Sequence, residues 1–145
     1  MGRTVVGMIT RVFVPGVPAP QGSAKAFVVK GHAIVTHDNK ATMPWRDRVA
    51  AFIRDAIGSG IEYPKGPVAV ELRFVMPRRA AEPKRVTPPH TRKPDSDKLS
   101  RAVLDSMSGL VFTDDAQVTH LEAFKRTAKI GEQPGLHASW GVDES

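Results

Sequence analysis

The stretch VAVELRFVM, from Val68 to Met76, alternates apolar side chains with the charged residues Glu71 and Arg73. A period of two is typical of a β-strand that buries one face and exposes the other. This segment is the clearest strand of the chain, and the predicted elements on either side of it complete the fold.

Upstream of it, the sequence predicts a strand, a hairpin and a helix. A mostly β-branched and apolar run covers residues 5–14 and stops at the proline-rich PGVPAPQGS. Within AFVVKGHAIVTH, residues 30–31 (Lys-Gly) separate two apolar runs, as in a hairpin whose turn needs positive φ. The helix follows and can end at Gly58. Its apolar face consists of Trp45, Val49, Phe52 and Ala56.

Downstream, a second helix and two strands are predicted. The helix places Leu99, Val103 and Met107 on one apolar face and can end at Gly109. The strands are expected at 118–128 and 136–140, separated by the turn KIGEQPG. We therefore expect an α+β fold, a single domain over the whole chain, with a mixed β-sheet and about two main helices packed on it.

Composition narrows the function. The chain has 145 residues, which favours one domain, and no cysteine, which excludes disulfides and thiolate metal sites and favours a reducing compartment. It has neither a long apolar run nor a secretory signal pattern, so we expect a soluble, cytoplasmic protein with no membrane partner. The net charge of +6 favours a polyanionic partner.

A basic segment, PRRAAEPKRVTPPHTRK (77–93), follows the central strand and contains four prolines and one acid, Glu82. It is either a solvated, extended loop or a flexible arm that binds DNA phosphates. The second reading is favoured here because the segment leads directly into a cluster of acids. The candidate DNA-binding residues are Arg78, Arg79, Lys84, Arg85, Arg92, Lys93 and, from the segment after the prolines, Lys25.

The acid cluster consists of Asp95, Asp97, Asp105, Asp114 and Asp115. If the chain folds back along the second helix, the Asp114-Asp115 pair can approach the first two acids. Carboxylates gathered at one point repel each other unless a cation neutralises them, and such oxygen ligands suit Mg²⁺ or, as a substitute, Mn²⁺. The alternative is structural: acids at a helix start often cap it, and Asp114-Asp115 is an ordinary turn sequence. The five histidines show no metal-ligand spacing and are expected to be structural or on the surface.

The acidic stretch PDSDKLSRAVLDSMSGLVFTDDAQV (94–118) resembles the signature of the RusA family of Holliday-junction resolvases. In that signature D-x-D opens a helix, L-D-x-(small or Met) closes it, and D-D-x-Q-(V/I) follows. VPGVPAPQGS is similar to the family's proline-rich segment and PGLHASW to its last strand. The resemblance covers most of the chain, strongly over 94–125.

The resemblance implies that Asp95, Asp97 and Asp115 bind the metal and that Asp114 supports them. It also implies a homodimer that presents two active sites to a four-way DNA junction, in the cytoplasm of a bacterial cell or of a phage-infected host. Where well-studied members have a catalytic lysine, this chain has Arg101, which keeps the charge but does not readily give up a proton. Lys125 is the second candidate for that task.

The expected function is Mg²⁺-dependent hydrolysis of phosphodiester bonds in four-way junctions, with paired nicks made by a dimer. A metal-dependent nuclease of other branched DNA, such as flaps and forks, and a non-catalytic binder of branched DNA are the alternatives.

Overall fold

The computed structural model describes residues 5–22, 24–37, 40–59 and 64–145. Its centre is a four-stranded sheet in the order β1-β6-β4-β5. The pair β4–β5 is parallel and the other two pairs are antiparallel, so the sheet is mixed. The strands are β1 (Val5–Pro15), β4 (Val68–Met76), β5 (Val118–Thr127) and β6 (Gly135–Asp143).

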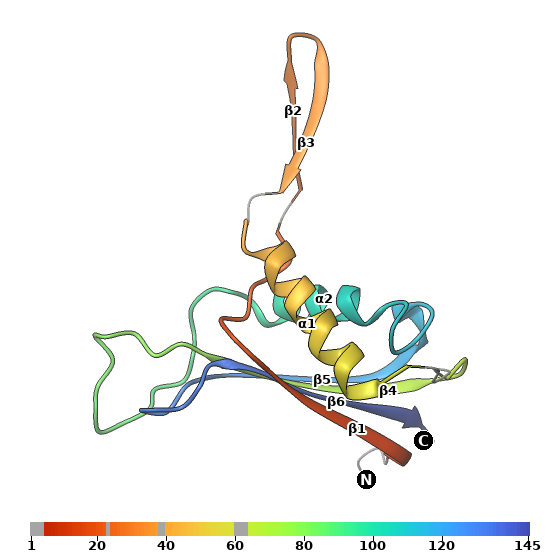
Figure 1. The fold of residues 1–145 in the computed structure, drawn as a ribbon. Helices are drawn as coiled ribbons and strands as arrows, with labels where there is room; N and C mark the ends of the chain where they lie inside the picture. Colours follow the sequence, from red (N-terminus) through yellow and green to blue (C-terminus); the bar gives the residue numbers. More distant parts are fainter. Residues whose placement is uncertain (1–4, 23, 38–39, 60–63) are drawn as a thin grey trace.

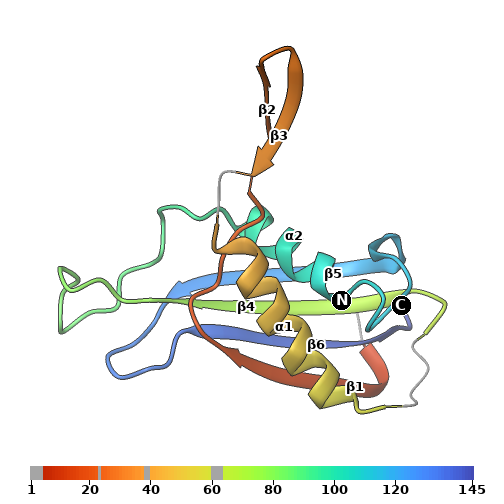
Figure 2. The same cartoon turned by 45° about the horizontal axis from the view of Figure 1, so that its top comes forward.

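Two helices, α1 (Thr42–Ile57) and α2 (Ser96–Met107), cover one face of this sheet (Figures 1 and 2). The α+β prediction, with a mixed sheet and two helices, is confirmed. Within the described residues, no helix is both long and apolar enough to span a membrane.

Strand β4 lies in the middle of the core, as its sequence pattern predicts. The side chains of Val70, Leu72 and Phe74 are at most 1% exposed and face the helices. Apolar side chains of both helices and of β6 pack against them and complete a single core, because each element has one apolar face to bury. The contributing residues include Trp45, Val49, Ile53, Leu99, Val103, Met107, Leu136 and Trp140.

The remaining strands, β2 (Ala24–Val29) and β3 (His32–His37), form a separate hairpin that projects from the body of the molecule (Figures 1 and 2). Its turn has positive φ at both Lys30 (50°) and Gly31 (78°), which is the backbone that tight hairpins require. The hairpin prediction is therefore confirmed.

The predicted helix ends are also found, since Gly58 and Gly109 follow α1 and α2 with φ of 72° and 81°. The last strand was underestimated: β6 continues to Asp143, beyond the predicted end at residue 140. It does so because β6 pairs with β1 on one side and β4 on the other, a long-range contact that local sequence does not show.

The connection from β4 to β5 determines where the functional residues lie. Two neighbouring parallel strands need a crossover connection. Helix α2, which lies between β4 and β5 in the chain, provides it by packing over the sheet (Figure 2). The basic segment 77–93 therefore leaves the end of β4, and the acids lie at the start of α2 and just before β5.

Candidate active site

Asp95 is the residue that precedes the first turn of α2. Its backbone is extended, and its carboxylate accepts no hydrogen bond from the amides of the helix, so the capping role considered for it is not observed. The carboxylate lies 3.6 Å from the ammonium of Lys93 instead. Asp95 is therefore held at the helix start while its carboxylate stays about two-fifths exposed.

Asp97 and Asp115 come together in one cleft of about 360 Å³, which we call the acidic cleft. One turn of α2 after Asp97, Arg101 lies on the same side of the helix and also lines this cleft. Leu121 and Ala123 of β5 also line it. Asp97 and Asp115 are 18 positions apart in the sequence. The crossover brings their carboxylates and the guanidinium of Arg101 to the same cleft.

Asp114 has a structural role in addition to its position beside Asp115. Its carboxylate accepts a hydrogen bond from the amide of Ala116 (3.0 Å), and the side chain of Gln117 accepts one from the Asp114 amide (3.2 Å). The two contacts cap the short 3₁₀ helix η1 (Asp115–Gln117). The turn that the sequence suggested for Asp114 is therefore observed.

The two adjacent acids do not titrate alike. The hydrogen bond from the Ala116 amide, and then that from the Asp115 side chain, lower the pKa of Asp114. The pKa of Asp115 is raised, first by its hydrogen bond to the Asp114 side chain, then by burial and by the negative charges of Asp114 and Asp105. A proton on Asp115 thus relieves repulsion that a bound cation would also relieve.

The donors of the acidic cleft are chemically suited to a divalent cation. Asp97 and Asp115 offer carboxylate oxygens, and Mg²⁺ typically takes one or two carboxylates together with water and substrate phosphate. Over the described ranges, no group of three or more His, Asp or Glu side chains is close enough to hold a metal by itself. Asp95, the third predicted ligand, lines a different cleft, described below.

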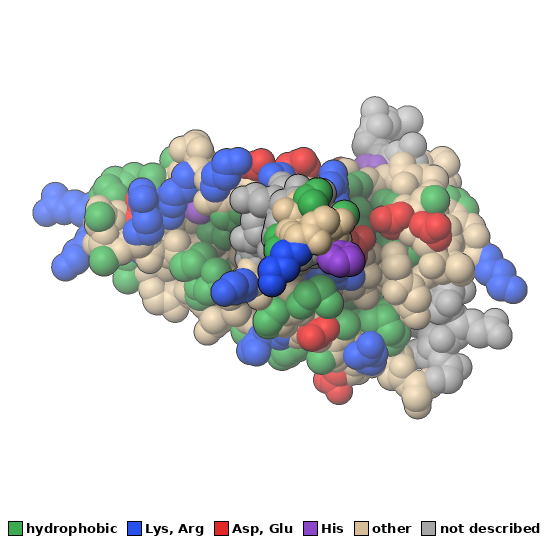
Figure 3. Space-filling model, turned by 90° about the horizontal axis from the view of Figure 1, so that it is seen from above, with side chains coloured by type: hydrophobic (Ala, Val, Ile, Leu, Met, Phe, Trp, Pro, Cys, Tyr) green, Lys and Arg blue, Asp and Glu red, His purple; other side chains and the backbone are tan. Residues whose placement is uncertain are grey.

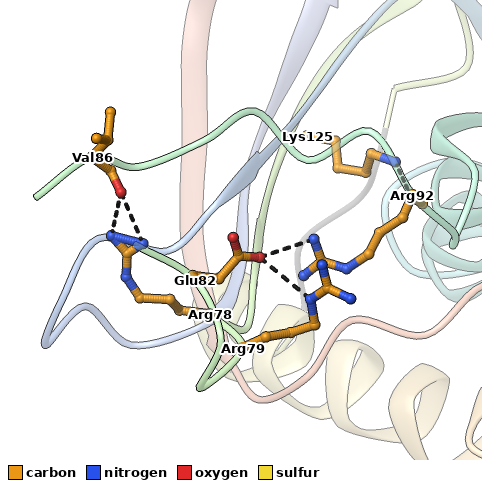
Figure 4. Close-up of polar contacts among 6 residues, drawn as sticks. All are labelled: Arg78, Arg79, Glu82, Val86, Arg92 and Lys125. Carbon is orange, nitrogen blue, oxygen red and sulfur yellow. Dashed lines mark hydrogen bonds and ion pairs between the residues drawn. The ribbon is translucent and has the colours of Figure 1, made fainter. Parts of the chain in front are cut away.

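Lys125 lies behind the site and not in the acidic cleft. Its ammonium donates to the backbone carbonyl of Arg92 (2.8 Å, Figure 4) and to that of Pro94 (2.9 Å), and the side chain is half-buried. In this position Lys125 fixes the chain that leads into Asp95.

The basic segment 77–93 is linked to itself through its single acid. The guanidinium groups of Arg79 and Arg92 both reach one oxygen of Glu82, at 3.4 and 3.1 Å (Figure 4). Arg78 donates to the carbonyl of Val86 (2.9 and 3.3 Å).

Other cations of the predicted DNA-binding set remain available at the surface. Lys84 and Arg85 are exposed, and Lys and Arg side chains gather at one end of the molecule (Figure 3). The side chain of Lys25, on β2, lies outside the described part of the structure.

A larger cleft, of about 710 Å³, was not predicted; we call it the proline cleft. The proline-rich segment 17–22 lines it, together with the end of β4 and residues 92–95. His90, expected to be structural or on the surface, is 7% exposed and also lines it. The prolines predicted an irregular segment. Its packing against α2 could not be predicted, because it depends on a contact between residues far apart in the sequence, Gln21 and Lys98.

Two comparisons with known proteins bear on this arrangement. A family model described as Endodeoxyribonuclease RusA matches residues 15–137, a span that includes both clefts and the basic segment. No curated protein matches the chain.

Proposed function

The chain belongs to the RusA family of endodeoxyribonucleases, and from that premise we propose that it resolves four-way DNA junctions by Mg²⁺-dependent hydrolysis at the acidic cleft. The family itself implies a DNA-binding, junction-resolving endonuclease. The observation that carries the site assignment is the meeting of Asp97 and Asp115 in one open cleft beside Arg101.

Asp97 and Asp115 would hold the cation, with Asp95 and Asp114 as the adjacent acids. When bound, Mg²⁺ lowers the pKa of a coordinated water and neutralises charge on phosphate oxygens. The exposed guanidinium of Arg101 faces the same opening and would bind the non-bridging oxygens of the scissile phosphate.

Lys125 would act as a positioning residue. Its bonds to the carbonyls of Arg92 and Pro94 hold the backbone on the N-terminal side of Asp95. A small displacement of a site residue is costly to a reaction that requires aligned reactants, so this support matters for the rate.

The basic segment would position the DNA through its phosphates. Arg79 and Arg92 share Glu82, which orders their side chains at the other cleft, lined by Asp95, while Lys84 and Arg85 are exposed. Contacts of this kind orient a nucleic acid without reading its sequence.

Two cuts in opposite strands require two sites, so we propose that the active species is a homodimer. Sedimentation equilibrium of the free protein and of its junction complex measures this directly. A complex containing one protein chain per junction that still makes paired nicks would contradict it.

The central experiment is cleavage of a synthetic mobile four-way junction with Mg²⁺ and with EDTA, using fork and linear duplex DNA as competing substrates. Asp97→Asn should lower the single-turnover rate by about 10³-fold, because one ligand and its charge are lost, while junction binding persists. The matched control is Asp55→Asn, an exposed acid on α1 whose loss should leave the rate unchanged. Preferred cutting of forks would indicate a different branched substrate, and binding without any cutting would indicate a non-catalytic protein.

A further inference from the structure

The proline cleft lies beside the start of α2 and has Asp95 on its wall. Its volume of about 710 Å³ is within the usual range for small-molecule sites, roughly 300–1,000 Å³. Pro18, Pro20 and Pro77 give it rigid apolar surfaces of the kind on which flat rings can stack. The proposed function does not yet use this space.

The cleft is held open by contacts between distant parts of the chain. The amide of Gln21 donates to the carbonyl of Lys98 on α2 (2.9 Å), and the Thr42 hydroxyl donates to the carbonyl of Pro20 (2.6 Å). The proline-rich segment is thus fixed to both helices, and a ligand would meet a largely preformed wall.

Three residues of the cleft carry buried polar atoms without a hydrogen-bond partner among the described residues: Gln21 Oε1, Arg78 Nε and His90 Nδ1. Buried polar groups are normally paired, so each of these atoms gains when a ligand supplies a partner. The pKa of His90 is lowered, first by burial and then by the charges of Arg92 and Lys125. A neutral imidazole offers one donor and one acceptor, and with the amide oxygen and the guanidinium it can match the mixed edge of a nucleobase.

The charge around the cleft favours a phosphate-bearing ligand. Arg79, Arg92, Lys93 and Lys98 line it together with Asp95, and even with Glu82, which pairs with Arg79 and Arg92, the cations outnumber the acids. The flat base of a nucleotide could therefore stack on the prolines and form hydrogen bonds inside the cleft, while its phosphates contact the surrounding cations.

We propose that the proline cleft binds one unstacked nucleotide of the strand being cut, reading its base with Gln21, Arg78 and His90. This inference rests on the proposed function, because the cleft and the acidic cleft are lined by neighbouring residues of α2 and its N-terminal flank. Bases at a branch point are easier to unstack than those within a duplex, so a junction supplies such a nucleotide at low cost. The cleft would then decide at which sequence the junction is cut.

The test maps cut positions on mobile junctions with randomised bases at the crossover, by sequencing the products. The wild type should prefer particular bases beside the cut, and Gln21→Leu should reduce the ratio between best and worst sequences by about tenfold, as expected when one base-reading hydrogen bond is lost. Gln133→Leu, which removes an exposed amide far along the chain, is the matched control and should keep the wild-type preference.

A second measurement requires no variant of the cleft. 2-Aminopurine placed beside the cut should fluoresce more strongly when uncleaved junction binds the Asp97→Asn protein, because its base has left the stack. Equal cutting of all sequences by the wild type, or an unchanged preference in Gln21→Leu together with no fluorescence rise, would overturn the inference. Failure of the proposed function is separate: it appears as a wild type that cuts no junction, and the fluorescence still reports whether the base leaves the stack when the protein binds.

Discussion

Replacing Lys125 with methionine removes the ammonium that holds the carbonyls of Arg92 and Pro94 and keeps an unbranched side chain of similar length. We expect the variant to fold but to be less stable and slower. The loss of stability follows from the two hydrogen bonds, and the loss of rate from the freedom gained by the backbone next to Asp95.

The magnitude follows from the geometry. Hydrogen bonds from a charged donor contribute about 1.5–3 kcal/mol each, so two bonds of 2.8 and 2.9 Å set an upper range of about 3–6 kcal/mol. Lys125 is only half-buried, so in the variant water can hydrogen-bond to the freed carbonyls. This lowers the expected decrease in the free energy of unfolding to about 2–3 kcal/mol. A displacement of Asp95 by about 1 Å after the loss of the Lys125 ammonium would lower the cleavage rate by about 10²-fold.

Urea unfolding, followed by the fluorescence of the buried Trp45 and Trp140, measures the stability change. Lys65→Met is the matched control, since Lys65 is exposed, and it should stay within about 0.5 kcal/mol of the wild type. Single-turnover cleavage across pH separates the two roles of Lys125. If Lys125 positions the backbone, its loss should lower the cleavage rate by the same factor at every pH. If it is a general acid, its loss should change the shape of the plot of rate against pH. An unfolding midpoint equal to that of the wild type would refute the argument from the two bonds.

Three further predictions concern charges. Arg101→Lys should keep most of the single-turnover rate and Arg101→Ala should lose about 10²-fold, because the position supplies charge to the transition state; equal rates for all three proteins would place Arg101 outside the reaction. Changing Lys84 and Arg85 together to alanine should weaken junction binding and reduce the slope of log affinity against log salt by about 0.9 per lost phosphate contact, and an unchanged slope would mean that neither residue touches DNA. Arg126 lowers the pKa of Glu132 from 4.5 to about 2, so this carboxylate stabilises the fold above its ordinary pKa and loses that effect as pH falls through 2. Glu132→Gln should therefore cost about 1 kcal/mol at pH 7, given the partial exposure of the pair, and thermal melts of the two proteins should converge toward pH 2; a constant difference would contradict the ion pair as its source.

The elements that could be predicted are those whose signal is local. The alternation in β4 and the helical spacing in α1 and α2 reflect one-sided burial, which each segment records in its own residues. The hairpin turn was predictable because Lys30-Gly31 has to adopt positive φ. The order of the sheet and the full length of β6 were not, since they depend on pairing between strands far apart in the chain.

For the acidic residues too, part of the arrangement could be predicted from local sequence and part depends on distant contacts. The spacing of Asp97 on its helix and of Asp115 before a strand allowed the two to meet, and the crossover brings them into one cleft. Asp95 is only two residues from Asp97, yet it lines the proline cleft, because the contact between Gln21 and Lys98 places the proline-rich segment there. Such a contact between residues 77 positions apart has no local signature.

The position of β6 has a consequence for how the protein is made. This strand is the last of the sheet to be synthesised, yet it lies between β1 and β4 and pairs with both. While the chain is still on the ribosome, β1 has no neighbour and β4 can pair only with β5, so two strand edges wait open until residues 135–143 emerge. We expect folding to be completed only after translation, and nascent chains halted before residue 135 to depend on chaperones for solubility.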